Sequence, residues 1–298
     1  MEMIKASILI PVRDDIEGLD ITLSSLTEAG IMFRHDLEVI VCNDGGGGAV
    51  SDVIEKFGCR EVRLESGMGS YAARNAGLKL ASGRVIAFLD ADQRVDPNWI
   101  DDGIRALADA DYVGGRIVVE SPSMPDVWER FDSTFAFPVE EYLRRGHFAP
   151  TANLFIRREV IDQVGNFIDE LFSGGDQEFG VRVYRAGLVQ KYCASAITYH
   201  PTRNRHEQLR KLHRTGSGVA EVRLKVWKHS PLAVLVSSGF GMVKVIPEAL
   251  WRLVSDTIIC RNKKGPDLIA FMLISKLRKA IFLYYLFCRT ARYYFAKT

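Results

Sequence analysis

The chain has 298 residues, of which 47% are hydrophobic, and its formal net charge is +2. This length and composition allow a sizeable core and fit one large α/β domain or two smaller ones. The five cysteines are odd in number and lack paired metal-ligand spacing, and no signal peptide is predicted, so we expect reduced cytosolic thiols.

The charge is distributed unevenly along the chain. Residues 241–298 contain eleven Lys/Arg and three Asp/Glu, a net of +8, so the first 240 residues carry −6. A basic C-terminal segment on an acidic body favours an anionic partner, either a nucleic acid or a lipid surface.

The first 90 residues alternate between strand and helix patterns. Strands are predicted at residues 6–12, 37–42, 62–64 and 85–89. Helices are predicted at residues 17–29, 50–57 and 71–80. Strands alternating with helices of this length indicate a mostly parallel sheet with right-handed crossovers.

The rhythm changes after Asp111. Further strands are predicted at 112–120, 149–157, 189–193 and 196–199, and further helices at 125–145, 158–164 and 174–186. A basic stretch follows at 202–214, then two apolar stretches at 232–246 and 268–287.

Two carboxylates follow the most apolar strand. Residues 85–89 are all apolar, and Asp90 and Asp92 come next, one residue apart. Open α/β sheets bind ligands at the carboxyl ends of their strands. One or two carboxylates together with substrate phosphates suit a hard divalent cation. The alternative is an acidic turn that caps a helix starting near Pro97.

Five short motifs occur in a fixed order. They are IPVR at 10–13, NDG at 43–45, ARNAG at 73–77, FLDAD at 88–92 and GDQEFGVR at 175–182. In this order, over residues 5–215, they resemble the family 2 glycosyltransferases. The resemblance implies an α/β GT-A (Rossmann-like) fold, a mostly parallel central sheet flanked by helices. It also implies inverting transfer of a sugar from a nucleotide-diphosphate donor, usually UDP-linked, to an acceptor hydroxyl.

The resemblance also suggests how the chain is divided. We expect residues 1–115 to bind the nucleotide sugar and residues 116–230 to form the acceptor-binding and catalytic half of the same domain. Residues 231–298 would be a helical, basic and aromatic extension. The glycine run 45–48 lacks the Gly-Lys-Ser/Thr ending of a phosphate loop.

The donor residues follow from the same resemblance. The backbone around Pro11, Val12 and Arg13 would line the base and ribose. Asp44 would accept the uracil N–H, because a carboxylate only accepts. Arg74 would contact the base or a phosphate. The alternatives are a turn residue for Asp44 and a solvated helix position for Arg74.

The metal assignment concerns three positions. Asp90, with Ala91 beside it, would meet the ribose, and Asp92 would bind Mn²⁺ or Mg²⁺ on the diphosphate. His200 resembles a further metal ligand, although a lone histidine is often structural. The arginines expected to close over the diphosphate are Arg203, Arg205, Arg210 and Arg214. A solvated basic helix face is their alternative.

Asp176 corresponds to the family's catalytic base, which takes the proton from the acceptor hydroxyl. A helix N-terminus would lower its pKa and desolvation would raise it, while a plain N-cap is the alternative. Gly174, Gly175 and Glu178 would contact the acceptor. Gly175 stands where the family often has Glu, and Glu178 could instead pair with Arg182 four residues on.

The tail is expected to lie on a membrane without crossing it. Residues 268–287 are long enough to span, but Lys276, Arg278 and Lys279 at the middle would cost about 2.5–3.5 kcal/mol each. A basic interfacial helix on an anionic lipid surface fits better, with no nucleic acid involved. The side chains expected to enter the acyl boundary are Phe271, Leu273, Phe282 and Leu286. A packed core helix or a homodimer interface is the alternative.

The resemblance and the basic tail together imply a cytoplasmic enzyme, peripheral on the inner face of the plasma membrane. It would add a sugar to a glycan or lipid-linked glycan in bacterial surface polysaccharide synthesis. One alternative is a catalytically inactive sugar-nucleotide sensor or membrane scaffold, disfavoured by the presence of Asp90, Asp92 and Asp176 together. The other is a nucleotidyltransferase, for which residues 13–16 are a poor pyrophosphate loop.

Overall fold

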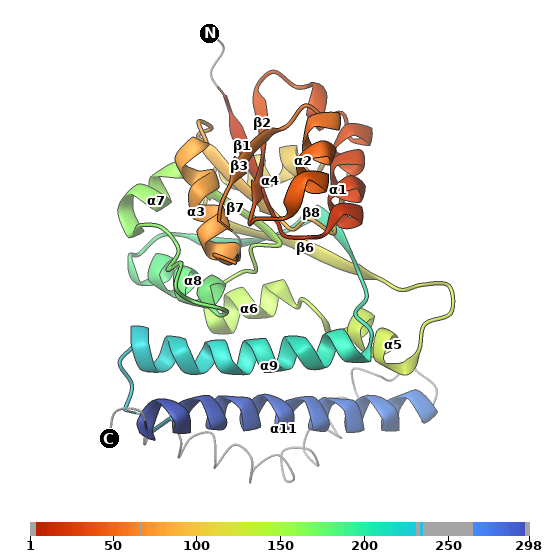
Figure 1. Ribbon diagram of the computed structural model, residues 1–298, viewed down its shortest axis with the longest axis vertical. Coiled ribbons are helices and arrows are strands. Elements are labelled where there is room, and N and C mark those ends of the chain that lie inside the picture. The colour runs from red at the N-terminus through yellow and green to blue at the C-terminus, as the bar shows by residue number, and fades with distance from the viewer. Residues whose placement is uncertain (1–3, 66, 231–232, 235–264, 296–298) are drawn as a thin grey trace. The chain divides into compact units, whose positions relative to one another are not determined.

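The computed structural model describes residues 4–65, 67–230, 233–234 and 265–295. The chain forms two compact units, each described here by itself (Figure 1). The first contains residues 1–120, 137–170 and 175–201, and the second contains residues 121–136, 171–174 and 202–298. The predicted functional division at residues 115 and 230 stays a prediction.

The first unit is built on an eight-stranded sheet in the order β3-β2-β1-β4-β7-β6-β8-β5. The strands are β1 (Ala6–Val12), β2 (Leu37–Asn43), β3 (Arg60–Arg63), β4 (Val85–Leu89), β5 (Arg94–Val95), β6 (Tyr112–Glu120), β7 (Asn153–Arg157) and β8 (Gln190–Pro201). The first four are mutually parallel where they pair, and β7 is antiparallel to both β4 and β6. Because β8 parallels β6, the carboxyl ends of β1, β2, β4, β6 and β8 share one edge.

Helices cover both faces of this sheet. They are α1 (Ile16–Glu28), α2 (Gly47–Lys56), α3 (Ser70–Leu80), α4 (Trp99–Ala106), α6 (Val139–Gly146), α7 (Arg158–Val164) and α8 (Gly175–Arg185), with a 3₁₀ turn η1 (Ile31–Phe33). Ile8 and Ile10 share a buried cluster with side chains of α1, α2 and α4. On the other face, a Cβ at Gly77 would lie 2.5 Å from Cys42 Sγ, so glycine there lets α3 pack closely on the sheet.

Two predicted elements differ in the structure. The predicted helix at 125–145 is two helices, α5 (Val127–Phe135) and α6, because Pro138 lacks an amide donor and disfavours the α conformation at Phe137 before it. The two strands predicted at 189–193 and 196–199 are one strand, β8. A register shift between Gly115 and Arg116 of β6 keeps β8 paired through the irregular stretch between them.

The described part of the second unit contains α5, α9 (Arg205–Glu221), a π-helical turn η2 (Val222–Val226) and α11 (Gly265–Phe295). Helices α9 and α11 pack side by side (Figure 1). A Cβ at Gly216 would lie 2.8 Å from the Phe282 carbonyl oxygen, which shows how closely the two backbones approach. Because α9 begins at Arg205, most of the basic stretch at 202–214 is helical.

Helix α11 confirms the predicted C-terminal helix but corrects which face of it is buried. Phe271 packs on Phe131 of α5, and Leu286 shares a buried cluster with Ala220. Their exposed fractions are 3% and 2%, so the prediction that both enter the acyl boundary is wrong. Phe282 is also partly buried, whereas Leu273 is 60% exposed.

Two further predictions concern a membrane crossing by the tail and the apolar stretch at 232–246. No helix within the described residues carries an apolar stretch long enough to cross a membrane. The apolar stretch at 232–246 lies outside the described residues except for 233–234.

Candidate active site

Asp176 lies in the first turn of α8 and is held by Thr151. The Thr151 hydroxyl donates to Asp176 Oδ1 at 3.1 Å, and the Thr151 amide approaches Oδ2 at 3.4 Å. Burial raises the pKa of the Asp176 carboxyl, the positive charge of Arg74 opposes the rise and the negative charge of Asp90 adds to it. A carboxylate that is costly to keep ionised is a stronger base than a solvated one.

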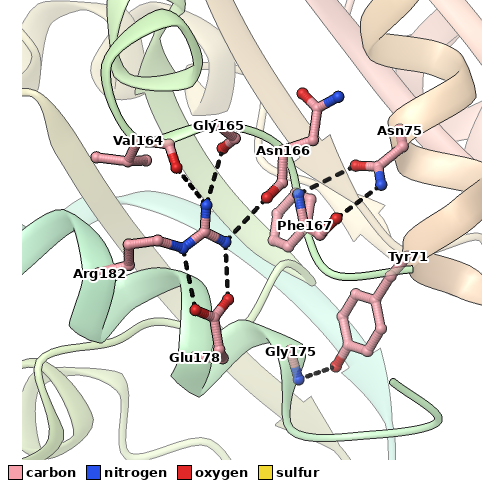
Figure 2. Close-up of polar contacts among 9 residues, drawn as sticks. All are labelled: Tyr71, Asn75, Val164, Gly165, Asn166, Phe167, Gly175, Glu178 and Arg182. Atoms are coloured by element: carbon pink, nitrogen blue, oxygen red, sulfur yellow. Dashed lines mark hydrogen bonds and ion pairs between the residues drawn. The ribbon is translucent and has the colours of Figure 1, made fainter. Parts of the chain in front are cut away.

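Tyr71 explains why glycine precedes Asp176. The Tyr71 hydroxyl accepts a hydrogen bond from the Gly175 amide at 2.9 Å (Figure 2). A Cβ at Gly175 would lie 2.6 Å from the Tyr71 ring, so no side chain fits at this position. The ring occupies the space that a glutamate at position 175 would need. Gly175 therefore fits α8 against Tyr71, and its predicted contact with the acceptor stays a prediction.

We expect Gly175→Ala to lower the stability of the folded protein by about 1–3 kcal/mol, the usual cost of overpacking. Thermal unfolding would register this as a loss of about 2–4 °C per kcal/mol. Gly48→Ala is the matched control, because a Cβ there meets no atom within 4 Å. An unchanged melting temperature for Gly175→Ala would show that Tyr71 yields easily and does not fix the start of α8.

Glu178 is part of the scaffold. Its carboxylate accepts from Arg182 Nε at 3.0 Å and from Nη2 at 2.7 Å, and its side chain is only 5% exposed (Figure 2). Arg182 also donates to the backbone carbonyls of residues 164–166. This confirms the predicted pair with Arg182, while the predicted contact of Glu178 with the acceptor stays a prediction. Together they fix α8 to the segment after α7.

Asn75 extends the same scaffold to α3. Its side-chain amide donates to the Phe167 carbonyl at 2.8 Å and accepts from the Phe167 amide at 3.2 Å (Figure 2). The Phe167 ring packs on those of Tyr71 and Phe179. The helix that carries Asp176 is thereby tied to the helix that carries Arg74.

Arg74 is buried and pairs with Asp90. Its Nη2 donates to Asp90 Oδ1 at 2.7 Å, and only 5% of the Arg74 side chain is exposed, so the solvated alternative is wrong. Arg74 Nε is buried without a hydrogen-bond partner in the described structure. Arg74 thus brings Asp90 within electrostatic reach of Asp176. The predicted nucleotide contacts of Arg74 and Asp90 stay predictions.

Asp44 fixes the loop before α3. Its two carboxylate oxygens accept from the Met68 and Gly69 amides at 2.9 and 3.0 Å, and its own amide donates to the Val12 carbonyl. Both interactions tie the ends of β1 and β2 to the start of α3. Each oxygen keeps a second lone pair, so the predicted uracil contact stays open to Asp44.

The other predicted donor residues differ in exposure. The Arg13 side chain is 53% exposed and lies near Asp14, while Pro11 is half-buried. The side chains of Val12 and Ala91 belong to the hydrophobic core. Val12 and Ala91 can therefore contribute only backbone atoms to a donor site. For Val12 the prediction concerned the backbone, and the predicted donor contact of Ala91 stays a prediction.

Asp92 and His200 lie together at the carboxyl edge of the sheet. His200 Nε2 is 3.4 Å from Asp92 Oδ2, with His200 2% exposed and the Asp92 side chain 37% exposed. His200 Nδ1 lies 2.5 Å from the Pro201 carbonyl oxygen, which can only accept, so Nδ1 carries a proton. Among the described residues, no group of three or more His, Cys, Asp or Glu side chains could by itself hold a metal.

Five predicted site residues belong to the second unit. Gly174 has a φ of +85°, which favours glycine, and its backbone packs near Gly218. Arg203 begins the approach to α9 with its amide donating to Asp132 Oδ2 at 2.9 Å. The arginines on α9 itself are Arg205, Arg210 and Arg214, all exposed. Their role as a phosphate lid stays a prediction.

Sequence reasoning missed Thr151 and Tyr71. Both touch the start of α8 from positions 25 and 104 residues away. The one available signal was Gly175 itself, because a glycine in place of a larger residue indicates that another group fills its space.

Comparisons with known proteins agree with this architecture. The model of the family described as "Glycosyl transferase family 2" matches residues 7–165. Glycosyltransferase AglE of Haloferax volcanii is 30% identical over 255 residues, which are 83% of this chain and 80% of that protein. Chondroitin synthase of Escherichia coli is 26% identical over 65% of this chain but only 34% of its own length.

Solved structures with a similar fold include the following two. The Pyrobaculum calidifontis mannosyltransferase PcManGT, in complex with GDP-Man and Mn²⁺, has a TM-score of 0.64 at 13% identity and covers 100% of this chain and 89% of its own. S. aureus TarS 1–349, in complex with UDP-GlcNAc, has a TM-score of 0.50 at 17% identity over 74% of this chain and 67% of its own. The predicted GT-A fold is confirmed, and the chain belongs to glycosyl transferase family 2.

Proposed function

We propose that this glycosyltransferase transfers a sugar with inversion from a nucleotide-diphosphate donor, a UDP-sugar, to a hydroxyl of a glycan or lipid-linked glycan. The observation that supports this best is Asp176, a half-buried carboxylate oriented by Thr151 and within electrostatic reach of the Arg74–Asp90 pair. An assay of nucleotide release from UDP-sugars, with and without added glycans, tests the proposal.

Asp176 acts as the general base in this proposal. Inversion requires the acceptor hydroxyl to attack the anomeric carbon from the side opposite the leaving nucleotide, and a base must take its proton. Asp176 Oδ1 keeps a lone pair beside the Thr151 hydrogen bond, so the carboxylate can accept the proton while it remains oriented. The raised pKa makes this proton transfer more favourable than it would be for a solvated aspartate.

Asp92 and His200 fit a divalent cation bound together with the donor. His200 Nε2 and Asp92 Oδ2 lie 3.4 Å apart, and an imidazole nitrogen and a carboxylate oxygen are both ligand types for a divalent cation. Asp92 and His200 would hold a cation such as Mn²⁺ or Mg²⁺, together with diphosphate oxygens of the donor. The ion would supply charge neutralisation to the leaving diphosphate.

We expect Asp92→Ala to weaken metal-dependent UDP binding. Interactions with charged groups contribute about 1.5–3 kcal/mol, so the loss should be about 10- to 150-fold. Calorimetric titration with UDP in the presence and absence of Mn²⁺ measures the effect. Asp96→Ala is the matched control, because Asp96 is a nearby aspartate that follows β5 and its carboxylate accepts from the Asn98 amide at 3.0 Å. Equal UDP affinity of Asp92→Ala and wild type with Mn²⁺ present would remove Asp92 from the metal site.

We also propose that α11 attaches the enzyme to an anionic lipid surface, at the inner face of the plasma membrane. Five exposed apolar side chains recur at intervals of four, seven, three and seven residues, which places them on one face of a helix. This apolar stripe consists of Leu273, Leu277, Tyr284, Phe287 and Tyr294. At 100° per residue, Lys276 and Arg292 flank it on either side. Apolar burial with flanking basic residues is the pattern of an interfacial helix.

A further inference from the structure

An open cavity of about 500 Å³ in the first unit lies outside every predicted site position. It is formed by β6, β8, α6 and the two residues before α6. Phe137 and Tyr192 line it with aromatic rings, and Arg116, Glu140 and Arg144 are among its charged residues. Its volume falls within the range of about 300–1,000 Å³ that is usual for small-molecule sites.

Phe137 connects this cavity to the Asp92–His200 pair. The Phe137 ring centroid is 5.1 Å from that of His200, and His200 Nε2 faces Asp92. The cavity therefore begins one side chain away from the two residues proposed to hold the cation. It also opens beside β6 and β8, whose carboxyl ends lie at the same edge of the sheet as Asp90 and Asp92.

Phe137 is held in an unfavourable backbone conformation. Its φ is +54°, in the left-handed region that bulky residues avoid, and Pro138 follows it. Backbone strain of this kind persists where the surrounding structure enforces it, and it occurs often at ligand sites. Here it places an aromatic ring between His200 and the cavity.

The charged groups of the cavity are balanced. Arg116 and Arg144 are matched by Glu140 and Glu141, so the lining carries no net charge. Arg144 is paired with Glu141 at 2.5 Å. Within the residues that the structure describes, Arg116 and Glu140 form no ion pair or side-chain hydrogen bond, although both act electrostatically on Tyr192. They remain available as one donor group and one acceptor group.

This combination suits an uncharged polar ring better than a phosphate. A nucleotide diphosphate would require a net positive lining, which is absent here. Aromatic rings offer apolar faces to the C–H surface of a sugar, while a carboxylate and a guanidinium can hydrogen-bond its hydroxyls. We propose that the cavity is an acceptor subsite, in which a pyranose ring of the receiving glycan packs on Phe137 and Tyr192 and hydrogen-bonds to Glu140 and Arg116. The inference rests on the proposed function.

The test uses the full chain with UDP and Mg²⁺ present and methyl glycosides of hexoses and N-acetylhexosamines as probes. Saturation-transfer NMR reports their binding. We expect at least one probe to bind wild type, and Tyr192→Ala and Glu140→Gln each to weaken it about tenfold, the scale of one aromatic or charged contact. The matched controls are Phe33→Ala and Glu159→Gln, exposed positions outside the cavity, which should bind like wild type.

The outcomes separate this inference from the proposed function. Failure of every probe to bind, or equal probe affinity in wild type, Tyr192→Ala and Glu140→Gln, overturns the subsite. A variant counts only if its melting temperature and UDP affinity match those of wild type, and two chemically different variants guard against a folding defect in one. If wild type neither binds UDP nor releases it from a UDP-sugar, the proposed function fails, whatever the probes do in the cavity.

Discussion

Asp176→Asn is expected to lower sugar transfer about 10²–10⁴-fold, the usual loss when a general base is removed. The amide keeps the shape of the side chain and can still accept the Thr151 hydrogen bond through its oxygen, but it cannot take a proton from the acceptor. UDP affinity, measured by calorimetry, should stay close to that of wild type. Asp169→Asn, at an exposed position, is the matched control. Turnover near the wild-type rate in Asp176→Asn would remove Asp176 from the base role.

The pH dependence provides an independent check of the same residue. Burial raises the pKa of Asp176, so transfer should fall as the pH drops through a value above the ordinary 3.8 of an aspartate. Between the unfolded and the folded pKa the folded state binds more protons, so stability decreases as pH rises through this window and stays reduced above it. Asp176→Asn should therefore have a higher melting temperature than wild type at neutral pH and no advantage at acid pH. A lower melting temperature at neutral pH would contradict this account.

Local patterns predicted the parts of the fold that depend on neighbours in sequence. The strand at 85–89 is a continuous apolar run, and its end at Asp90 and Asp92 follows from that pattern alone. The helix that begins at Gly175 and the pair Glu178–Arg182 depend on residues at most four positions apart. Because these features depend on nearby residues, the strand and the helix were predicted within a few residues of their observed positions.

Contacts between distant residues could not be read from the sequence. Thr151, two residues before β7, contacts Asp176, and Tyr71 of α3 fills the space beside Gly175. The fold brings both residues to the start of α8. Which face of α11 is buried could not be read from the sequence either. Its apolar residues lie on two faces, and period alone does not say which face packs on α9. Phe271 and Leu286 were assigned to lipid and are core residues.

Substitution by glutamate is expected to have different effects on stability at the two faces of α11. Leu286→Glu places a carboxylate in the cluster with Ala220 and Leu283, so we expect it to destabilise the second unit. Leu277 and Tyr284, 45% and 57% exposed, lie on the apolar stripe, so glutamate there should leave the melting temperature close to that of wild type. Deleting the chain after Ser230 would remove α11 altogether, so a loss of stability could not be separated from a loss of lipid binding. Point variants keep them apart.

The double variant Leu277→Glu, Tyr284→Glu is expected to detach the protein from anionic vesicles. Burial of an apolar side chain contributes about 1.5–3 kcal/mol, so the loss of two should weaken vesicle binding about 10²–10⁴-fold. Co-sedimentation with phosphatidylcholine vesicles, with and without phosphatidylserine, measures it. The double variant Ile21→Glu, Phe33→Glu, at exposed apolar positions of the first unit, is the control.

Salt distinguishes the two contributions to this binding. High salt screens the attraction between the basic residues and phosphatidylserine but leaves apolar burial in place, so it should release wild type only in part. The double variant keeps less of the apolar contribution, so high salt should release a larger fraction of it than of wild type. If wild type fails to bind phosphatidylserine vesicles, or if the double variant binds as wild type does, the stripe is not a lipid contact. A concentration-dependent change in mass that the same substitutions abolish would then identify it as an interface between two copies of the chain.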